Sequence, residues 1–195
     1  MRYSKHSTLY EERVWDIAQR LLGCELVRVL YGTKVVVRIV ETEAYDQNDA
    51  ASHSYRGQTP RTEVMFGPPG HAYVYFTYGM HYCMNIVTGP VGHGSAVLIR
   101  AVEPLEGLEV IKANRPKIRS EHELTNGPAK LCQALNIDKT MNGHNLDEAP
   151  LKLVLRPAID PKGIITTTRI GISKDTHRLW RFYIKDNAYV SIKNH

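Results

Sequence analysis

The 195-residue sequence has few cysteines and no long apolar run. Its three cysteines are odd in number, widely spaced and without a CxxC pair, which argues against a disulfide framework or a zinc knuckle and favours a reducing compartment. No stretch approaches the ~18 to 20 consecutive apolar residues of a membrane span. The first residues lack the apolar segment of a signal peptide, and there are no repeats or Gly/Ser linkers. We therefore expect one cytoplasmic domain over residues 1–195, without membrane attachment.

Positive charge is concentrated near the C-terminus. Lysine and arginine number 25 against 20 aspartates and glutamates, which gives a net charge of +5. Residues 161–195 carry seven basic side chains and only two acidic ones. A basic segment favours a polyanionic partner, because each phosphate that it contacts releases counterions. The alternative is a solvated cationic face without a partner, and charge alone does not separate the two.

Strand patterns outnumber helix patterns in the sequence. Apolar residues at helical spacing predict a helix over residues 9–22, which Gly23 ends. Two more helices are expected at 105–113 and 128–135, the second with Asn126 as a candidate N-cap. Strands are predicted at residues 25–31, 34–44, 72–78, 82–87, 95–102, 151–156, 167–172 and 180–192. Because tight turns join most of them, we expect an α+β domain with an antiparallel sheet.

The predicted strand at 34–44 carries two glutamates near its end. Side chains two positions apart share one face of a strand, so Glu41 and Glu43 are expected on the same side as the apolar Val35, Val37 and Ile39. Partly buried carboxylates suit general acid or base catalysis, because desolvation raises their pKa. In the alternative, both glutamates are solvated where the strand leaves the core. The residues alone do not choose between Glu41 and Glu43.

Tyrosine is concentrated in one part of the chain. Six of the eleven tyrosines fall between residues 45 and 82. Tyr73 and Tyr75 share a face of one predicted strand, and Tyr78 lies at a hairpin turn, where so large a ring is rarely buried. Tyrosine on a strand is commonly half-buried packing. Exposed rings instead suit stacking on nucleobases, which makes nucleic acid the leading partner.

Arg100 interrupts the apolar strand predicted at 95–102. A buried charge needs a partner. A carboxylate such as Glu43 or an anionic substrate would serve. The alternative is an arginine that extends to solvent at the edge of the sheet.

Three further patterns give weaker signals. Asp49 and His53 suggest a metal site, but no HExxH or HxH pattern accompanies them, so no metal is predicted. The Gly-Pro-Pro-Gly run at 67–70 lacks the Lys-Ser/Thr of a phosphate loop and indicates a rigid turn. The free amides at the start of the helix at 128–135, together with Lys130, are able to hold a phosphate. An ordinary capped helix fits that segment equally well.

Six stretches of the sequence follow one another in a specific order. They are VETEAY (40–45), DAASHS (49–54), QTPR (58–61), MFGPPGHAYVYFTYGMHYCMNIV (65–87), AVLIRAVEPLEG (96–107) and LTNGPAKLCQAL (124–135). Together they resemble the alkyladenine (3-methyladenine) DNA glycosylase family, and weaker similarity continues through RIGI (169–172) and RFYI (181–184). The resemblance covers most of the chain. It implies a single mixed α+β domain around a curved antiparallel β-sheet, with a protruding DNA-intercalating β-hairpin.

The resemblance also implies roles for the matched residues. Glu43 matches the general base of the family, and Arg100 matches the arginine that helps to hold the attacking water. The positions that match the pocket around an extruded base are Tyr45, His53, Tyr75 and Asn85. The positions that match DNA contacts are Tyr78, Met80, His81, Arg61 and Lys130, of which Tyr78 is the wedge that fills the gap in the duplex. Thr62 stands where some relatives have Asn, which leaves the backbone contacts there open.

The function that the resemblance implies is excision of damaged purines from double-stranded DNA without a metal or other cofactor. We expect a monomer, because a duplex must lie across the face of the protein. Its substrates would be 3-methyladenine, 7-methylguanine, hypoxanthine and ethenoadenine. A water activated by Glu43 would hydrolyse the N-glycosidic bond and leave an abasic site for base excision repair, without a lyase step. Two alternatives stay open. One is a non-catalytic nucleic-acid binding module that uses Tyr78 and the basic tail, and the other is a metal-dependent hydrolase that uses Asp49 and His53.

Overall fold

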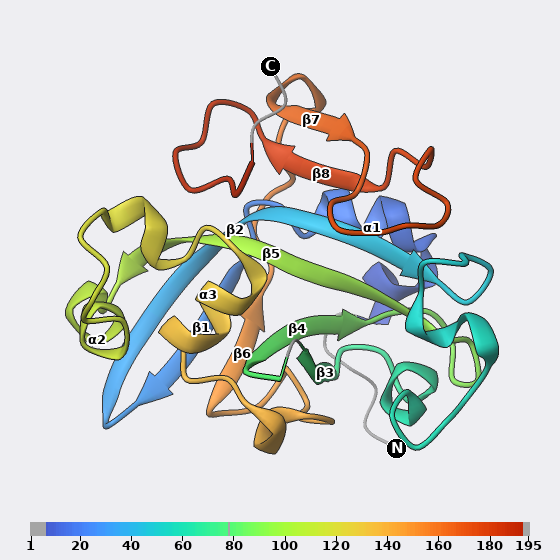
Figure 1. Cartoon of the computed structure of the whole chain (residues 1–195), viewed down its shortest axis with the longest axis horizontal. Helices are drawn as coiled ribbons and strands as arrows, with labels where there is room; N and C mark the ends of the chain where they lie inside the picture. Colours follow the sequence, from blue (N-terminus) through green and yellow to red (C-terminus); the bar gives the residue numbers. More distant parts are fainter. Residues whose placement is uncertain (1–6, 78, 193–195) are drawn as a thin grey trace.

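The computed structural model describes residues 7–77 and 79–192 (Figure 1). Over these ranges the chain forms three α-helices, short 3₁₀ turns and one antiparallel sheet of eight strands. The helices are α1 (Val14–Arg20), α2 (Leu108–Asn114) and α3 (Pro128–Ala134). The strands are β1 (Glu25–Leu30), β2 (Thr33–Asp46), β3 (Ala72–Thr77), β4 (His81–Val87), β5 (Ser95–Glu106), β6 (Leu151–Val154), β7 (Ile164–Thr167) and β8 (Arg181–Ile184).

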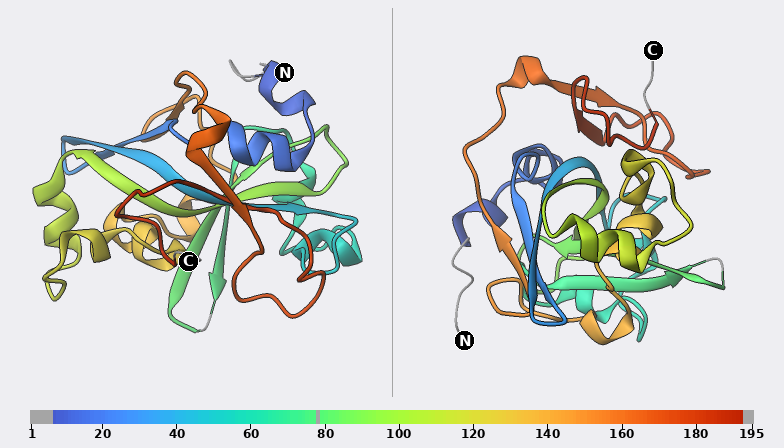
Figure 2. Two further views of the ribbon diagram at one scale, coloured as in Figure 1. Left: turned by 90° about the horizontal axis from the view of Figure 1, so that it is seen from above. Right: turned by 90° about the vertical axis from the view of Figure 1, so that its left-hand side faces the viewer.

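Two long strands, β2 and β5, form the centre of the sheet. The strand order is β3-β4-β5-β2-β1-β6, and β8 pairs both with the second half of β2 and with β7. β2 and β5 pair along most of their length and curve across the whole molecule (Figure 1). The β3–β4 hairpin projects from the body in both views of Figure 2. The predicted fold class, an α+β domain around a curved antiparallel sheet, is confirmed.

One hydrophobic core holds these layers together. It unites the apolar sides of α1 and α3 with the inward-facing residues of the central strands. Ile17 and Ala18 in α1, and Leu21 at its C-cap, are completely buried at helical spacing, as the pattern over 9–22 predicts. Thr42 of β2 adds a polar contact, because its hydroxyl donates to the Ala18 carbonyl at 2.8 Å. This helix therefore fixes the position of the second half of β2.

Several predicted element boundaries are wrong. The helix expected over 9–22 is a 3₁₀ turn at Ser7–Glu11 followed by α1, because the backbone at Arg13 is extended (ψ 144°). The helix expected from 105 begins at Leu108, after Gly107 (φ +79°), where a Cβ would lie 2.9 Å from the Lys34 carbonyl oxygen. The strand expected over 167–172 is β7, and the chain beyond Thr167 is a loop.

The start of α3 also differs from the prediction. Gly127, and not Asn126, is the N-cap residue of this helix. The Asn126 side chain instead accepts a hydrogen bond from Lys130 Nζ at 2.7 Å. Lys130 is therefore tied to the helix start rather than free above it.

An irregularity in β2 corrects the expected orientation of the two glutamates. The pairing of β2 with β5 shifts register on both sides of Glu41. Val40 packs with Tyr189, and Glu41 accepts hydrogen bonds from Ser191, so both point toward the C-terminal segment. Thr42 then faces α1. The bulge reverses the alternation, so Glu41 and Glu43 face away from the apolar stripe of the first half of β2.

Candidate active site

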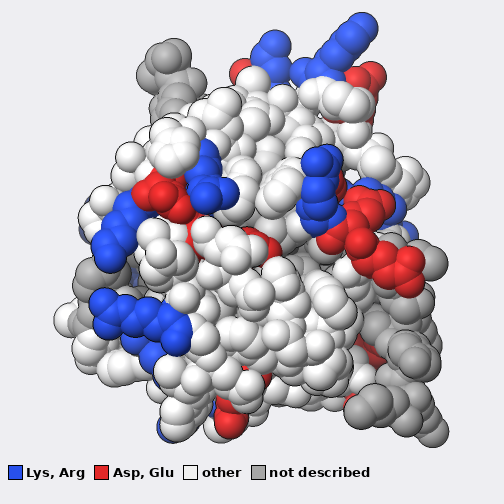
Figure 3. Space-filling model, turned by 90° about the vertical axis from the view of Figure 1, so that its right-hand side faces the viewer, with Lys and Arg blue, Asp and Glu red and all other residues white. Residues whose placement is uncertain are grey.

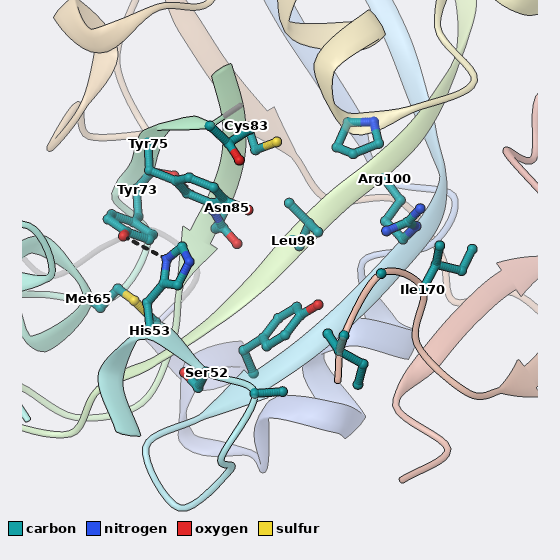
Figure 4. A pocket seen from close by; sticks show the side chains of 16 residues that line it. Ser52, His53, Met65, Tyr73, Tyr75, Cys83, Asn85, Leu98, Arg100 and Ile170 are labelled. Atoms are coloured by element: carbon teal, nitrogen blue, oxygen red, sulfur yellow. Dashed lines mark hydrogen bonds between the residues drawn. The ribbon is translucent and has the colours of Figure 1, made fainter. Parts of the chain in front are cut away.

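A cavity of about 380 Å³ opens beside the second half of β2 (Figure 4). Its walls come from β2, β3, β4, β5, the start of α3 and two loops, around residues 51–53 and 170–172. Figure 4 shows His53 with the two tyrosines of β3 on one side, and Arg100 and Ile170 on the other. The cavity is therefore aromatic at one end and polar at the other.

Glu43 lies directly behind the polar wall and is completely buried. Its Oε1 accepts a hydrogen bond from the backbone N–H of Ile170 at 2.7 Å, and its Oε2 accepts one from the Tyr45 hydroxyl at 2.8 Å. Arg100 Nη1 lies 3.2 Å from the same Oε2. Tyr45, Arg100 and Ile170 all line the cavity. The Tyr45 and Arg100 side chains and the Ile170 peptide therefore lie between the carboxylate and the open space of the cavity.

Glu41 is equally buried, but its carboxylate has more hydrogen-bond donors around it. Its Oε1 accepts from Arg100 Nε at 3.0 Å, from Arg181 Nε at 2.8 Å and from Ser191 Oγ at 2.9 Å. Its Oε2 accepts from the backbone N–H of Ser191 at 2.7 Å. A carboxylate has about four acceptor sites. Glu41 receives four donors in total, three of them at Oε1, whereas Glu43 receives three and has capacity for one more.

Arg100 connects the two glutamates. The prediction that this buried arginine pairs with a carboxylate is confirmed, and it pairs with both Glu41 and Glu43. Burial acts to lower the pKa of Arg100, but the Glu43 and Glu41 carboxylates outweigh it and hold this pKa above the ordinary value. The guanidinium therefore stays cationic at neutral pH and offsets part of the negative charge beneath the cavity.

The aromatic end of the cavity carries little charge of its own. His53 Nδ1 lies 3.1 Å from the Tyr73 hydroxyl, and the His53 ring meets the Tyr75 ring edge-on at 4.6 Å. Burial, assisted by the nearby Arg61, lowers the pKa of His53 to about 4, so the imidazole is neutral near pH 7. Burial raises the pKa of Tyr73 and of Tyr75. Neutral, electron-rich rings are suited to contact with a cationic ring.

Tyr45 and Asn85 have their polar groups fixed. Burial and the adjacent Glu43 raise the pKa of Tyr45 well above its ordinary value, so its hydroxyl remains a donor to the carboxylate. Asn85 Nδ2 donates to the Tyr73 carbonyl at 3.1 Å, and the side chain is nearly buried. Cys83 is buried and also lines the cavity, and burial raises the pKa of its thiol.

The residues expected to contact DNA lie around the hairpin and the cavity. Tyr78, the expected wedge, lies outside the described residues. Met80 is 70% exposed near the hairpin tip, next to the exposed His81. Arg61 is exposed, and its guanidinium carbon lies 5.7 Å from the centre of the Tyr75 ring at the aromatic end.

Asp49 does not face an open site. Its two oxygens accept hydrogen bonds from the guanidinium of Arg169, with Nη2 2.9 Å from Oδ1, and both side chains are completely buried. No group of three metal-binding side chains occurs within residues 7–77 and 79–192. Because Arg169 occupies the carboxylate, the described structure gives no support to a metal-dependent site at Asp49 and His53.

The basic C-terminal segment is not one cationic face. Arg169 and Arg181 are buried in ion pairs, and Arg178 lies 3.1 Å from the Asp175 carboxylate. Figure 3 shows lysine and arginine side chains in separate groups on one face of the molecule, several of them beside aspartate or glutamate side chains. Part of the local excess of positive charge is thus structural.

Among the helices of the described ranges, none has the length and apolar character needed to cross a membrane.

Residues 8–188 match the family model of methylpurine-DNA glycosylases. The chain belongs to this family. A protein of Carboxydothermus hydrogenoformans, named as a candidate 3-methyladenine DNA glycosylase, is 53% identical over 185 residues, which cover 94% of this chain and 96% of that protein. Proteins with the same name are 50% identical in Francisella tularensis subsp. tularensis (91% of this chain, 93% of that protein) and 47% identical in Methanoculleus marisnigri (95% and 97%). Membership in the family confirms the resemblance identified in the sequence.

Several residues of this site were not singled out from the sequence. Ile170 acts through its backbone N–H, which no residue type reveals. Tyr73 was seen only as a member of the tyrosine cluster, and its bond to His53 depends on the fold. The partnership of Asp49 with Arg169 spans 120 positions, so no local pattern indicates it.

Proposed function

We propose that the protein is a monofunctional DNA glycosylase that hydrolyses the N-glycosidic bond of alkylated or deaminated purines in duplex DNA. Its membership in the methylpurine-DNA glycosylase family and the names of its relatives support this activity. The observation that carries the proposal is the environment of Glu43. Its carboxylate is held by three groups of the cavity wall and has capacity for one more donor, while the neighbouring Glu41, which already receives four donors, has no partner that lines the cavity except Arg100.

The reacting carbon, C1′ of a nucleotide, is inaccessible inside a stacked duplex. The damaged nucleotide must therefore be rotated out of the helix, at a cost of a few kcal/mol. In the proposed complex the base enters the aromatic cavity between Tyr45 on one side and His53 with Tyr75 on the other. The wedge that fills the vacated space is Tyr78, as the family resemblance implies, and stacking in the gap offsets part of the cost.

Hydrolysis then depends on Glu43 and its neighbours. A water bound at the remaining acceptor site of Glu43 transfers a proton to the carboxylate as its oxygen attacks C1′. The bond from C1′ to the purine nitrogen breaks and its electron pair goes to the base, so a cationic lesion leaves as a neutral base and a neutral lesion leaves as an anion that takes up a proton from water. The carboxylate beside the sugar stabilises the developing oxocarbenium ion. Arg100 holds Glu43 in place through an ion pair, and it pairs with Glu41 at the same time. The product is an abasic site and a free base.

The cavity also accounts for the proposed substrate range. Cationic lesions such as 3-methyladenine and 7-methylguanine are good leaving groups and are attracted to the ring faces of the tyrosines. Neutral lesions such as hypoxanthine and ethenoadenine depend more on the positioning of Glu43. The fixed amide of Asn85 would crowd the exocyclic amine of normal guanine. No lysine lines the cavity among the described residues, and we propose that no Schiff-base lyase step follows.

The test is single-turnover cleavage of a duplex with one hypoxanthine, in the presence of a chelator, with alkali to break abasic sites. Wild type and Glu43→Gln are compared, with ethenoadenine and methylated DNA as further substrates. Glu103→Gln is the matched control, because Glu103 is also paired with an arginine, Arg38, at 2.5 Å, but away from the cavity.

We expect cleavage by wild type and by Glu103→Gln, and loss of hypoxanthine cleavage by Glu43→Gln with duplex binding retained. If wild type binds lesions tightly but cleaves none of the three substrates, the protein is a binding module and the proposed activity is wrong. If Glu43→Gln keeps the wild-type rate, Glu43 is not the base.

A further inference from the structure

A completely buried ion pair, Asp49 with Arg169, lies next to the cavity but outside the proposed chemistry. Besides both oxygens of Asp49, Arg169 contacts the second half of β2. Its Nη1 donates to the Ala44 carbonyl at 3.0 Å. Ala44 lies between Glu43 and Tyr45 in the chain, so this bond adds a contact from the loop to the strand pairing that already holds the backbone there.

The guanidinium of Arg169 is also enclosed by two aromatic rings. Its central carbon lies 4.7 Å from the ring centre of Tyr45 and 5.3 Å from that of Trp180. Trp180 in turn stacks on Trp15 of α1 at 4.9 Å. A column of rings and one cation thus runs from the helix α1 to the wall of the cavity, and Arg169 is its link to Tyr45.

The pair connects the two loops that complete the cavity. Asp49 Oδ1 accepts the backbone N–H of Ala51 at 3.1 Å, which orders the loop that carries His53. Arg169 directly precedes Ile170, whose backbone N–H donates to Glu43. One ion pair therefore connects three parts of the cavity wall: the strand β2 and the loops that carry His53 and Ile170.

Stability alone is a poor explanation for such a pair. Moving two charges out of water costs several kcal/mol per ion, and a well-packed apolar replacement is often as stable. A guanidinium, however, is planar and presents several donors in fixed directions. It can bind both oxygens of Asp49, reach the Ala44 carbonyl and lie against the face of Tyr45 at the same time.

We infer that Asp49 and Arg169 form a positioning device, which sets the place of Glu43 and Tyr45 relative to the bound base. The inference rests on the proposed function and deepens it, because it assigns Arg169 as a positioning residue for the neutral lesions. Their excision depends on an accurately placed base, whereas cationic lesions leave more readily. A displacement of about 1 Å in an active site costs on the order of 100-fold in rate.

The experiment compares Arg169→Lys and Asp49→Asn with wild type. Arg28→Lys is the matched control, since Arg28 is also buried and bonds two backbone carbonyls, far from the cavity wall. Single-turnover rates at saturating enzyme are measured on hypoxanthine and on 7-methylguanine duplexes, with duplex affinity measured separately. Amide hydrogen exchange of the peptide around Ile170 is followed in the same proteins.

We expect both cavity variants to lose about 10- to 100-fold in hypoxanthine excision, with at most about a threefold loss on 7-methylguanine and with affinity for the duplex unchanged. Exchange around Ile170 should rise at least about tenfold while the central strands stay protected. The control Arg28→Lys should change neither the ratio between lesions nor the exchange at Ile170.

Equal losses on both lesions, or exchange at Ile170 that stays at the wild-type rate, would show that the pair is merely structural and would overturn the inference. A wild type that excises neither lesion would refute the proposed function instead. The exchange measurement then still decides whether the pair orders the loop. Asp49→Asn preserves the shape of the side chain, so it serves if Arg169→Lys does not fold.

Discussion

Glu41→Gln should destabilise the protein more than Glu43→Gln, although only Glu43 is proposed to act in catalysis. The reason is the number of buried cations that each carboxylate serves. Glu41 pairs with Arg100 and Arg181, both of which are buried. Arg181 has no second carboxylate partner among the described residues, and its Nη1 already lacks a hydrogen-bond acceptor.

The difference can be estimated from these contacts. Removing one partner of a buried ion pair costs about 3–5 kcal/mol, because the other charge is left without compensation. In Glu43→Gln, Arg100 keeps Glu41, and the loss is nearer to that of one mismatched buried hydrogen bond, about 1–3 kcal/mol. For a domain of this size each kcal/mol lowers Tm by about 2–4 °C. Glu41→Gln should therefore melt roughly 6–20 °C below wild type.

Thermal and urea unfolding of the two variants and wild type provide the assay, with single-turnover cleavage measured on the fraction that remains folded. We expect Glu41→Gln to have the lower Tm and to retain excision at low temperature. We expect Glu43→Gln to have the higher Tm and to lose excision of hypoxanthine. If Glu43→Gln is the less stable of the two, then the hydrogen-bond assignment of the two carboxylates is wrong.

Two further predictions concern the cavity wall. His53 has a pKa of about 4 in the folded protein, below its ordinary value of 6.5, so the unfolded chain binds this proton more tightly. Stability that depends on neutral His53 is present above about pH 6.5 and is lost as the pH falls toward 4. The free energy of unfolding, measured in urea, should fall less over that pH range in His53→Phe than in wild type. Equal pH dependence in both proteins would contradict the lowered pKa of His53. Asn85→Ala should raise excision of guanine relative to hypoxanthine by about tenfold or more, measured as abasic sites in undamaged duplex. An unchanged ratio would remove Asn85 from the selectivity of the cavity.

The strand β2 shows how far a sequence pattern reaches. Alternation of side chains predicts the strand and places two acidic residues near the sheet. It also predicts the wrong side for them, because the bulge around Glu41 leaves no trace in the residue types. Burial of Glu43 comes instead from the loop at Ile170 and from β8, which are more than 120 positions away. Pairing between distant segments therefore decides the environment of Glu43, which local spacing identifies only as a candidate.

The family motifs predicted more of the site than composition or periodicity did. They select Glu43 over Glu41, which stays a prediction, and the structure shows that Glu43 is bonded to three groups that line the cavity. Composition was less reliable for the basic tail. Counting charges cannot separate a cation exposed to phosphate from one such as Arg181 that is buried beside a carboxylate.

The buried charges around the cavity are balanced, and the balance connects stability with substrate choice. Three carboxylates and three arginines are buried there: Glu41, Glu43, Asp49, Arg100, Arg169 and Arg181. An excess arginine in this region of low dielectric would repel a cationic purine, whereas an excess carboxylate would be costly to desolvate. Neutralising Glu41, which pairs with two of these arginines, therefore leaves an uncompensated cation near the cavity. Glu41→Gln should lose affinity for duplexes with cationic lesions more than for duplexes with neutral ones, a sign opposite to that expected when only the position of Glu43 is disturbed.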